Sequence, residues 1–109
     1  MRKFFLLTLT GLGCWLAAPS TMKAQFGADK IYNANCVPCH SADGSSSSPA
    51  GKAMHAQDLR SEEVQKQSDA ALTEVITKGR GKMPAFGAKL KPDDVTKLVA
   101  YIRALADKK

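Results

Sequence analysis

Two cysteines and a histidine stand together in the segment Cys36-Val37-Pro38-Cys39-His40. Positions i, i+3 and i+4 of a helical turn lie on nearly one face, so both thiols and the imidazole can reach the same partner. C-x-x-C-H is the pattern of covalent c-type haem attachment, in which the thiols add to the two porphyrin vinyl groups and the imidazole reaches the iron. The spacing therefore predicts one haem, anchored by Cys36 and Cys39, with His40 as an axial ligand.

Three other interpretations of this segment stay open. A thioredoxin-like redox pair needs a βαβ setting, whereas the chain has no strand pattern. A structural zinc site needs four ligands, and beyond residue 24 the chain has two cysteines and two histidines, of which His55 lies in a Ser/Gly-rich region. A disulfide between Cys36 and Cys39 is chemically reasonable in an exported protein, but it leaves His40 without a role. The motif together with export favours haem.

A methionine can fill the position opposite the histidine, as in electron-carrying cytochromes. Beyond residue 24 the candidates are Met54 and Met83. Met83 follows Gly81-Lys82 and precedes Pro84, in a segment that breaks from helix and is stiffened by proline. Met54 lies in a loop only fourteen residues after His40. We therefore predict Met83 as the distal ligand, the alternative being a core-filling role, which is the usual one for a buried methionine.

The elements that must position these side chains are helices, because the apolar residues recur with a helical period and no strand is evident. Residues 41–57 contain four consecutive serines and only alanines and Met54 as apolar members, which is typical of a loop. We expect Gly79 to end one helix in a left-handed conformation and Pro92 to start another. The expected helices cover about 28–39, one turn near 61–64, 68–79, and 92 to about 105.

This organisation predicts an all-α domain of three or four helices wrapped around one covalently bound haem. Its connecting segments are long for a compact helical domain, and such loops need something to pack against. A domain of this size is also marginal at burying enough apolar surface without a cofactor or a disulfide. The haem would fill both needs.

The first residues of the chain resemble a secretory signal peptide. A basic start, Met1-Arg2-Lys3, precedes an uncharged and mostly apolar run of fifteen residues over 4–18. That run is shorter than the roughly 20 residues of a spanning helix, and small residues follow it, as at a cleavage site. We expect residues 1–24 to be the leader, cut between about 18 and 25, and residues 25–109 to be the domain. Cys14 only loosely matches a lipoprotein processing site, because Gly11 stands where an aliphatic residue is favoured.

Charge argues against one class of partner. Residues 25–109 contain thirteen Lys and Arg against ten Asp and Glu, a net charge of +3. A nucleic-acid-binding domain of this size would need a basic patch that dominates its surface. Nucleic acid is therefore not an expected partner.

From about residue 28 to 105 the sequence resembles a class I cytochrome c, and it is most similar to the short bacterial and photosynthetic single-haem carriers. Three motifs in the right order carry the resemblance. They are YNANCVPCH at 32–40, GRGKMPAF at 79–86 and VAYIRAL at 99–105.

The resemblance implies several contacts. The first and last helices should cross with Tyr32 and Tyr101 near the crossing, and Leu59 should pack on the haem. Family members often have glycine at the position of Ala28, where the helices cross. Many also have proline at the position of Gln57, with a carbonyl there accepting from the ligand histidine. Because a carbonyl does not depend on the side chain, this bond to His40 can persist and would set its tautomer.

Weaker signals come from charged residues. Arg60 either reaches a haem propionate as a charge-assisted donor or is an ordinary loop arginine, and His55 is expected to be a solvated loop residue. Five basic residues surround the Met83 segment and form either a rim beside the exposed haem edge or an ordinary solvated surface. These are Lys78, Arg80, Lys82, Lys89 and Lys91.

The function that follows is a periplasmic single-haem carrier that passes one electron between redox proteins. It is not expected to be an enzyme, because His40 and Met83 would fill both axial positions. We expect a monomer without a membrane span, whose redox partners present acidic docking faces. Two alternatives are an electron-entry subunit of a larger redox complex and, if Met83 does not bind the iron, a haem sensor or peroxidase-like protein.

Overall fold

The computed structural model describes Gly13 and residues 27–108, so the predicted leader at 1–24 lies, apart from Gly13, outside the described residues. The described part of the chain is helical, and its only β-type pairing is an isolated bridge between Arg80 and Met83. This confirms the predicted all-α fold. None of the described helices is long and apolar enough to cross a membrane.

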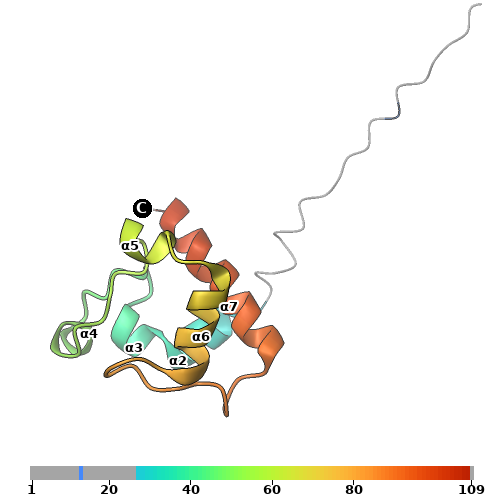
Figure 1. The fold of residues 1–109 in the computed structure, drawn as a ribbon. Helices are drawn as coiled ribbons and strands as arrows, with labels where there is room; N and C mark the ends of the chain where they lie inside the picture. The colour runs from blue at the N-terminus through green and yellow to red at the C-terminus, as the bar shows by residue number, and fades with distance from the viewer. Residues whose placement is uncertain (1–12, 14–26, 109) are drawn as a thin grey trace, which may run out of the picture.

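Six helices follow one another in the described chain, three of them only four or five residues long (Figure 1). The three longer helices correspond to the predicted ones, with the first interrupted at Cys36, whose φ of −109° separates α2 from α3. The bounds are α2 Ala28–Asn35, α3 Val37–His40, α4 Pro49–Ala53, α5 Glu62–Gln65, α6 Asp69–Lys78 and α7 Pro92–Asp107.

Local chemistry accounts for the ends of these helices. The hydroxyls of Ser61 and Ser68 cap α5 and α6 by accepting from the backbone N–H three residues on. Gly79 ends α6 with the predicted positive φ, 76°, but its ψ of 170° gives an extended rather than a left-handed helical conformation. At α7, Pro92 occupies the first turn and the Asp94 carboxylate accepts from the Lys91 N–H at 3.2 Å.

The loop predicted over 41–57 is wrong in one part, because α4 lies within it. The Ser48 hydroxyl accepts from the Gly51 N–H at 3.0 Å, and Pro49 stands in the first turn, where its missing N–H leaves no bond unmade. Helix α4 has too few apolar residues to show a hydrophobic period. Its local signal is Ser48 followed by Pro49, at the end of the serine run.

The core forms where α7 packs against both α2 and α6 (Figure 1). Tyr32 of α2 is fully buried, its ring centroid lies 4.8 Å from that of Tyr101, and its hydroxyl donates to the Ser41 carbonyl at 2.7 Å. The implied crossing of first and last helices near these two tyrosines is thus confirmed, with Ala28 fully buried beside it. The buried apolar residues of the cluster include Leu72, Ile76, Val95, Leu98, Val99, Ile102 and Leu105.

Arg103 joins α7 to the segment between α5 and α6. Its guanidinium donates to the carbonyls of Gln65 and Gln67 and pairs with the Asp69 carboxylate at 2.8 Å. The Gln65 side-chain amide in turn donates to the Leu59 carbonyl at 2.7 Å and to the Ile102 carbonyl at 3.1 Å. The side chains of Arg103 and Gln65 therefore hold residues 59–69 against α7, the longest of the described helices.

Candidate functional site

The C-x-x-C-H segment forms a helical turn at the junction of α2 and α3. The Cys36 carbonyl accepts from the N–H groups of Cys39, at 3.2 Å, and of His40, at 2.8 Å. Both thiols are free and only partly exposed. Burial, and then the neighbouring Cys39, raise the pKa of Cys36 to about 11, so this thiol is protonated at neutral pH. Two thiols and one imidazole are thus held within a single turn.

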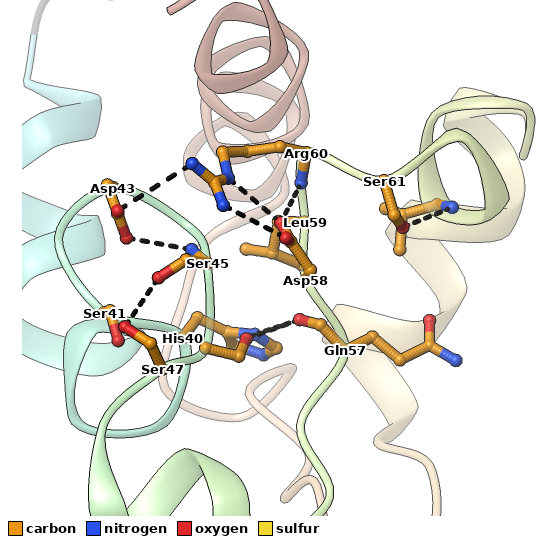
Figure 2. A network of polar contacts seen from close by, with 12 residues as sticks. His40, Ser41, Asp43, Ser45, Ser47, Gln57, Asp58, Leu59, Arg60 and Ser61 are labelled. Atoms are coloured by element: carbon orange, nitrogen blue, oxygen red, sulfur yellow. Dashed lines mark hydrogen bonds and ion pairs between the residues drawn. The ribbon is translucent and has the colours of Figure 1, made fainter. Parts of the chain in front are cut away.

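The His40 ring has one nitrogen committed to hydrogen bonding. Its Nδ1 lies 3.1 Å from the Gln57 carbonyl oxygen (Figure 2), the contact that the resemblance implied. A carbonyl oxygen only accepts, so Nδ1 carries the proton and donates. In a neutral imidazole this leaves the Nε2 lone pair free to bind a metal. Burial lowers the pKa of His40, partly opposed by the Gln57 bond, which favours this neutral form.

Helix α4 packs directly on this turn through Gly51. A Cβ added to Gly51 would lie 2.2 Å from the Cys39 carbonyl oxygen and 2.7 Å from that of Ser46. Both neighbours are backbone atoms, which cannot rotate away as a side chain can. Only glycine at this position allows α4 to sit against the turn that bears Cys39 and His40.

Gly51→Ala is therefore expected to destabilise the protein by about 3 kcal/mol or more, at or above the top of the usual range for overpacking, because the added Cβ would lie 2.2 Å from a backbone oxygen. Denaturant unfolding of the haem-loaded protein measures this free energy. Gly81→Ala is the matched control, because Gly81 has a φ of +55° but open space around its Cα, so its cost is about 1–2 kcal/mol of left-handed strain. Equal or smaller destabilisation by Gly51→Ala would contradict the close packing of α4 on the turn.

Met83 lies in a tight backbone loop after α6. Arg80 and Met83 exchange two backbone hydrogen bonds, at 3.1 and 2.9 Å. Gly79 closes the loop, because a Cβ there would lie 2.7 Å from the Met83 carbonyl oxygen. The Phe86 N–H then donates to the Ile76 carbonyl at 2.9 Å, which returns the chain to the end of α6. The Met83 side chain is half-buried against the core.

Leu59 and Arg60 lie on the segment that passes His40. Leu59 is buried in the core, and its N–H donates to the Gly44 carbonyl at 2.8 Å. The Arg60 guanidinium makes two bonds to the Asp58 carboxylate, each at 3.1 Å, and lies 3.9 Å from the Asp43 carboxylate (Figure 2). Two acidic side chains thus hold the arginine, and its contact with a propionate stays a prediction.

The remaining candidates lie at the surface. Met54 is 41% exposed, and His55 is exposed with a φ of 53°. All five rim residues are exposed, and Lys78 pairs with Glu74 at 3.2 Å. Two residues that the sequence did not single out prove central to the turn, Gly51 of α4 and Ser46. The P-A-G triplet after a serine cap was a signal for the first, whereas nothing distinguished Ser46 from its three serine neighbours.

The residues present fit a covalently held haem. Free thiols and an imidazole with an available Nε2 lie on one turn, and a set of half-buried apolar side chains packs against the core. That set is Ile31, Cys36, Val37, Met83, Phe86, Leu90 and Tyr101. The thiols of Cys36 and Cys39 are free, as thioether attachment requires. Within residues 27–108, no three His, Cys, Asp or Glu side chains gather as a metal ion alone would require.

Comparison with known proteins gives one consistent result. The family model described as cytochrome C oxidase, cbb3-type, subunit III matches residues 27–102. A cytochrome c6 of Nostoc sp. (strain PCC 7120 / SAG 25.82 / UTEX 2576) is 33% identical over 110 residues, which cover 98% of this chain and 96% of that protein. A cytochrome c6 of Microcystis aeruginosa is 37% identical over 78 residues, covering 72% and 93% respectively. Among solved structures, the KustC0563 c-type cytochrome is similar with a TM-score of 0.66 and 32% identity, over 72% of this chain and 95% of that one.

Proposed function

The chain belongs to the class I cytochromes c and carries one covalently attached haem c, and on this premise we propose that Cys36 and Cys39 hold the haem and that His40 and Met83 are its axial ligands. The protein is a single-haem electron carrier. When bound, the haem supplies a one-electron couple whose potential the protein tunes. We also propose that Leu59, which is buried in the core, packs on the haem.

The observation that carries this proposal is the state of the His40 ring. Its Nδ1–H donates to the Gln57 carbonyl, which leaves the Nε2 lone pair of the neutral ring available to a metal. The Arg80–Met83 loop supports Met83 as the second ligand, because its two backbone hydrogen bonds limit where the Met83 thioether can point. With both axial positions filled by the chain, no position is left for a substrate, and we propose a carrier without enzymatic activity.

Redox titration of the haem-loaded protein tests this function. A carrier should follow a one-electron Nernst curve, reversibly, and should show negligible turnover of hydrogen peroxide. The oxidised protein should also show the weak visible band of methionine–iron ligation, lost only at high cyanide. Rapid peroxide turnover or immediate ligand binding would favour the haem sensor or peroxidase-like alternative.

We propose a redox partner with an acidic docking face. Lys78, Arg80, Lys82, Lys89 and Lys91 are exposed around the Met83 loop and together form what we term the basic rim. Charges at such a rim act mainly on the association rate, and their effect fades as salt shortens the Debye length to about 8 Å at physiological strength. Arg60 lies on a different segment, held by Asp58 and Asp43, and its propionate contact is part of the proposal.

Lys82→Glu is expected to slow electron transfer to an acidic protein severalfold at low salt and to have little effect at high salt. Stopped-flow kinetics over a range of ionic strength measures this. Lys66→Glu, at the C-terminal cap of α5, makes the same change in net charge away from the rim sequence. If both variants slowed transfer equally, net charge and not the basic rim would steer the encounter.

A second candidate function has one observation in its favour. The family model that matches residues 27–102 is described as subunit III of a cytochrome c oxidase. An electron-entry subunit of a complex is therefore an alternative to a free monomer. Gel filtration of the native protein separates the two. We propose the monomer, and co-elution with a stoichiometric membrane partner would contradict it.

We propose that residues 1–24 are a signal peptide and that residues 25–109 act in the periplasm. Intact mass spectrometry of the exported protein should find an N-terminus at Thr21 or Gln25. A diacylated Cys14 would contradict this and indicate a membrane-tethered carrier.

A further inference from the structure

Ser46 is a buried polar residue in an unusual backbone conformation. Its exposed fraction is 5%, and its φ is +57°, in the region that side-chain-bearing residues rarely adopt. Its N–H donates to the His40 carbonyl at 2.9 Å. The serine hydroxyl lies 3.0 Å from Nδ1 of the same histidine.

The Ser46 hydroxyl, the Gln57 carbonyl and His40 Nδ1 each lie within hydrogen-bond distance of the other two. The hydroxyl donates to the Gln57 carbonyl at 2.5 Å, and its oxygen lies 3.0 Å from His40 Nδ1. The carbonyl cannot donate, so the single hydroxyl proton points at Gln57. The contact with Nδ1 is favourable only if Nδ1–H is the donor. Because its hydroxyl proton is used on the Gln57 carbonyl, Ser46 requires the same tautomer of His40 as Gln57 does.

Gln57 needs this support more than a proline would. Proline fixes its own φ, whereas glutamine leaves the backbone at this position free, and Gln57 is exposed. The Ser46 hydroxyl ties the Gln57 carbonyl to the loop that also binds the His40 backbone. The hydrogen bond from Ser46 therefore restrains the backbone at Gln57, as the ring of a proline would.

We propose that Ser46 is a positioning residue for His40, which holds the Gln57 carbonyl and shares the Nδ1 proton so that the imidazole keeps one tautomer and orientation. This inference rests on the proposed role of His40 as an axial ligand. Two acceptors on Nδ1–H draw its proton away from the ring and make the ring a stronger electron donor. A stronger donor stabilises the oxidised state, so Ser46 lowers the reduction potential.

Two variants that both lack the hydroxyl but differ in backbone freedom test this role. Ser46→Ala retains the left-handed strain and Ser46→Gly relieves it, so their unfolding free energies should differ. Their reduction potentials should rise by the same amount, because both lose the same hydrogen bond. A change of about fivefold in the reduction equilibrium, typical of one net hydrogen bond, is about 40 mV for one electron at 59 mV per tenfold.

A second readout is hydrogen exchange of the His40 Nδ1–H in the reduced, haem-loaded protein, followed by NMR. Exchange should be faster in both Ser46 variants than in wild type. Ser47→Ala and Ser47→Gly are the controls, because Ser47 is exposed and its hydroxyl accepts from the Ser45 hydroxyl at 2.8 Å rather than contacting His40 or Gln57. These controls should leave the potential and the exchange rate unchanged.

The outcomes separate the inference from the proposed function. If His40 is an axial ligand, the porphyrin ring current shifts its ring-proton resonances far upfield in wild type; ordinary shifts would overturn the ligand assignment itself. With upfield shifts present, a potential that is unchanged or lower in both Ser46 variants, or unaltered Nδ1–H exchange, would overturn the role of Ser46 alone. Potentials that tracked the unfolding free energies of the two variants would indicate a merely structural residue.

Discussion

Changing both Cys36 and Cys39 to alanine is expected to abolish covalent haem and to leave the chain largely unfolded. Each thioether uses one thiol, so no covalent link can remain. The segments between the helices, including 41–48 and 80–91, then lose the haem surface on which we propose that they pack. A domain this small has little other core. A denaturing gel stained for haem peroxidase activity measures attachment, and far-UV circular dichroism measures the loss of helix.

The single variants Cys36→Ala and Cys39→Ala are the controls, since one remaining thioether should retain some stained haem. A haem band that survived the double change would overturn the attachment sites. A double variant with the full helical signal would show instead that α2, α6 and α7 suffice to hold the fold, and would contradict the structural role given to the cofactor.

Met83→Ala is expected to keep the haem attached but to vacate its distal position. Carbon monoxide should then bind the reduced protein readily, and the reduction potential should fall by on the order of 0.1–0.2 V, since the choice of axial ligands spans about 0.8 V among haem proteins and methionine raises the potential. Visible spectroscopy with carbon monoxide and redox titration measure the two effects.

Met54→Ala is the matched control, because Met54 is exposed and far from the Arg80–Met83 loop in sequence. It should change neither quantity. If Met54→Ala opened the distal position and Met83→Ala did not, the choice between the two methionines would be reversed. Retention of the wild-type potential in both variants would exclude methionine ligation.

The longer helices and the haem-binding motif of this protein can be predicted from local sequence. The periods of α6 and α7, the serine before α6, Gly79 after it and Pro92 at the start of α7 are near-neighbour signals, and each helix follows from them. The five residues from Cys36 to His40, together with the predicted export, favour a c-type haem, and the family and its cofactor are confirmed by the comparisons. Their individual roles as ligands stay a prediction.

What only the tertiary structure decided involves residues that meet across long stretches of chain. Arg103 meets Gln65 and Gln67, Arg60 is held by Asp43, and Gly51 contacts the Cys39 carbonyl. Ser46 differs from Ser45 and Ser47 in no local property, yet it alone of the three reaches His40 and Gln57. The reason is physical. A helix satisfies its backbone within four residues and so leaves a local pattern, whereas a hydroxyl or a glycine in a loop acquires its role only from the group that folding brings against it.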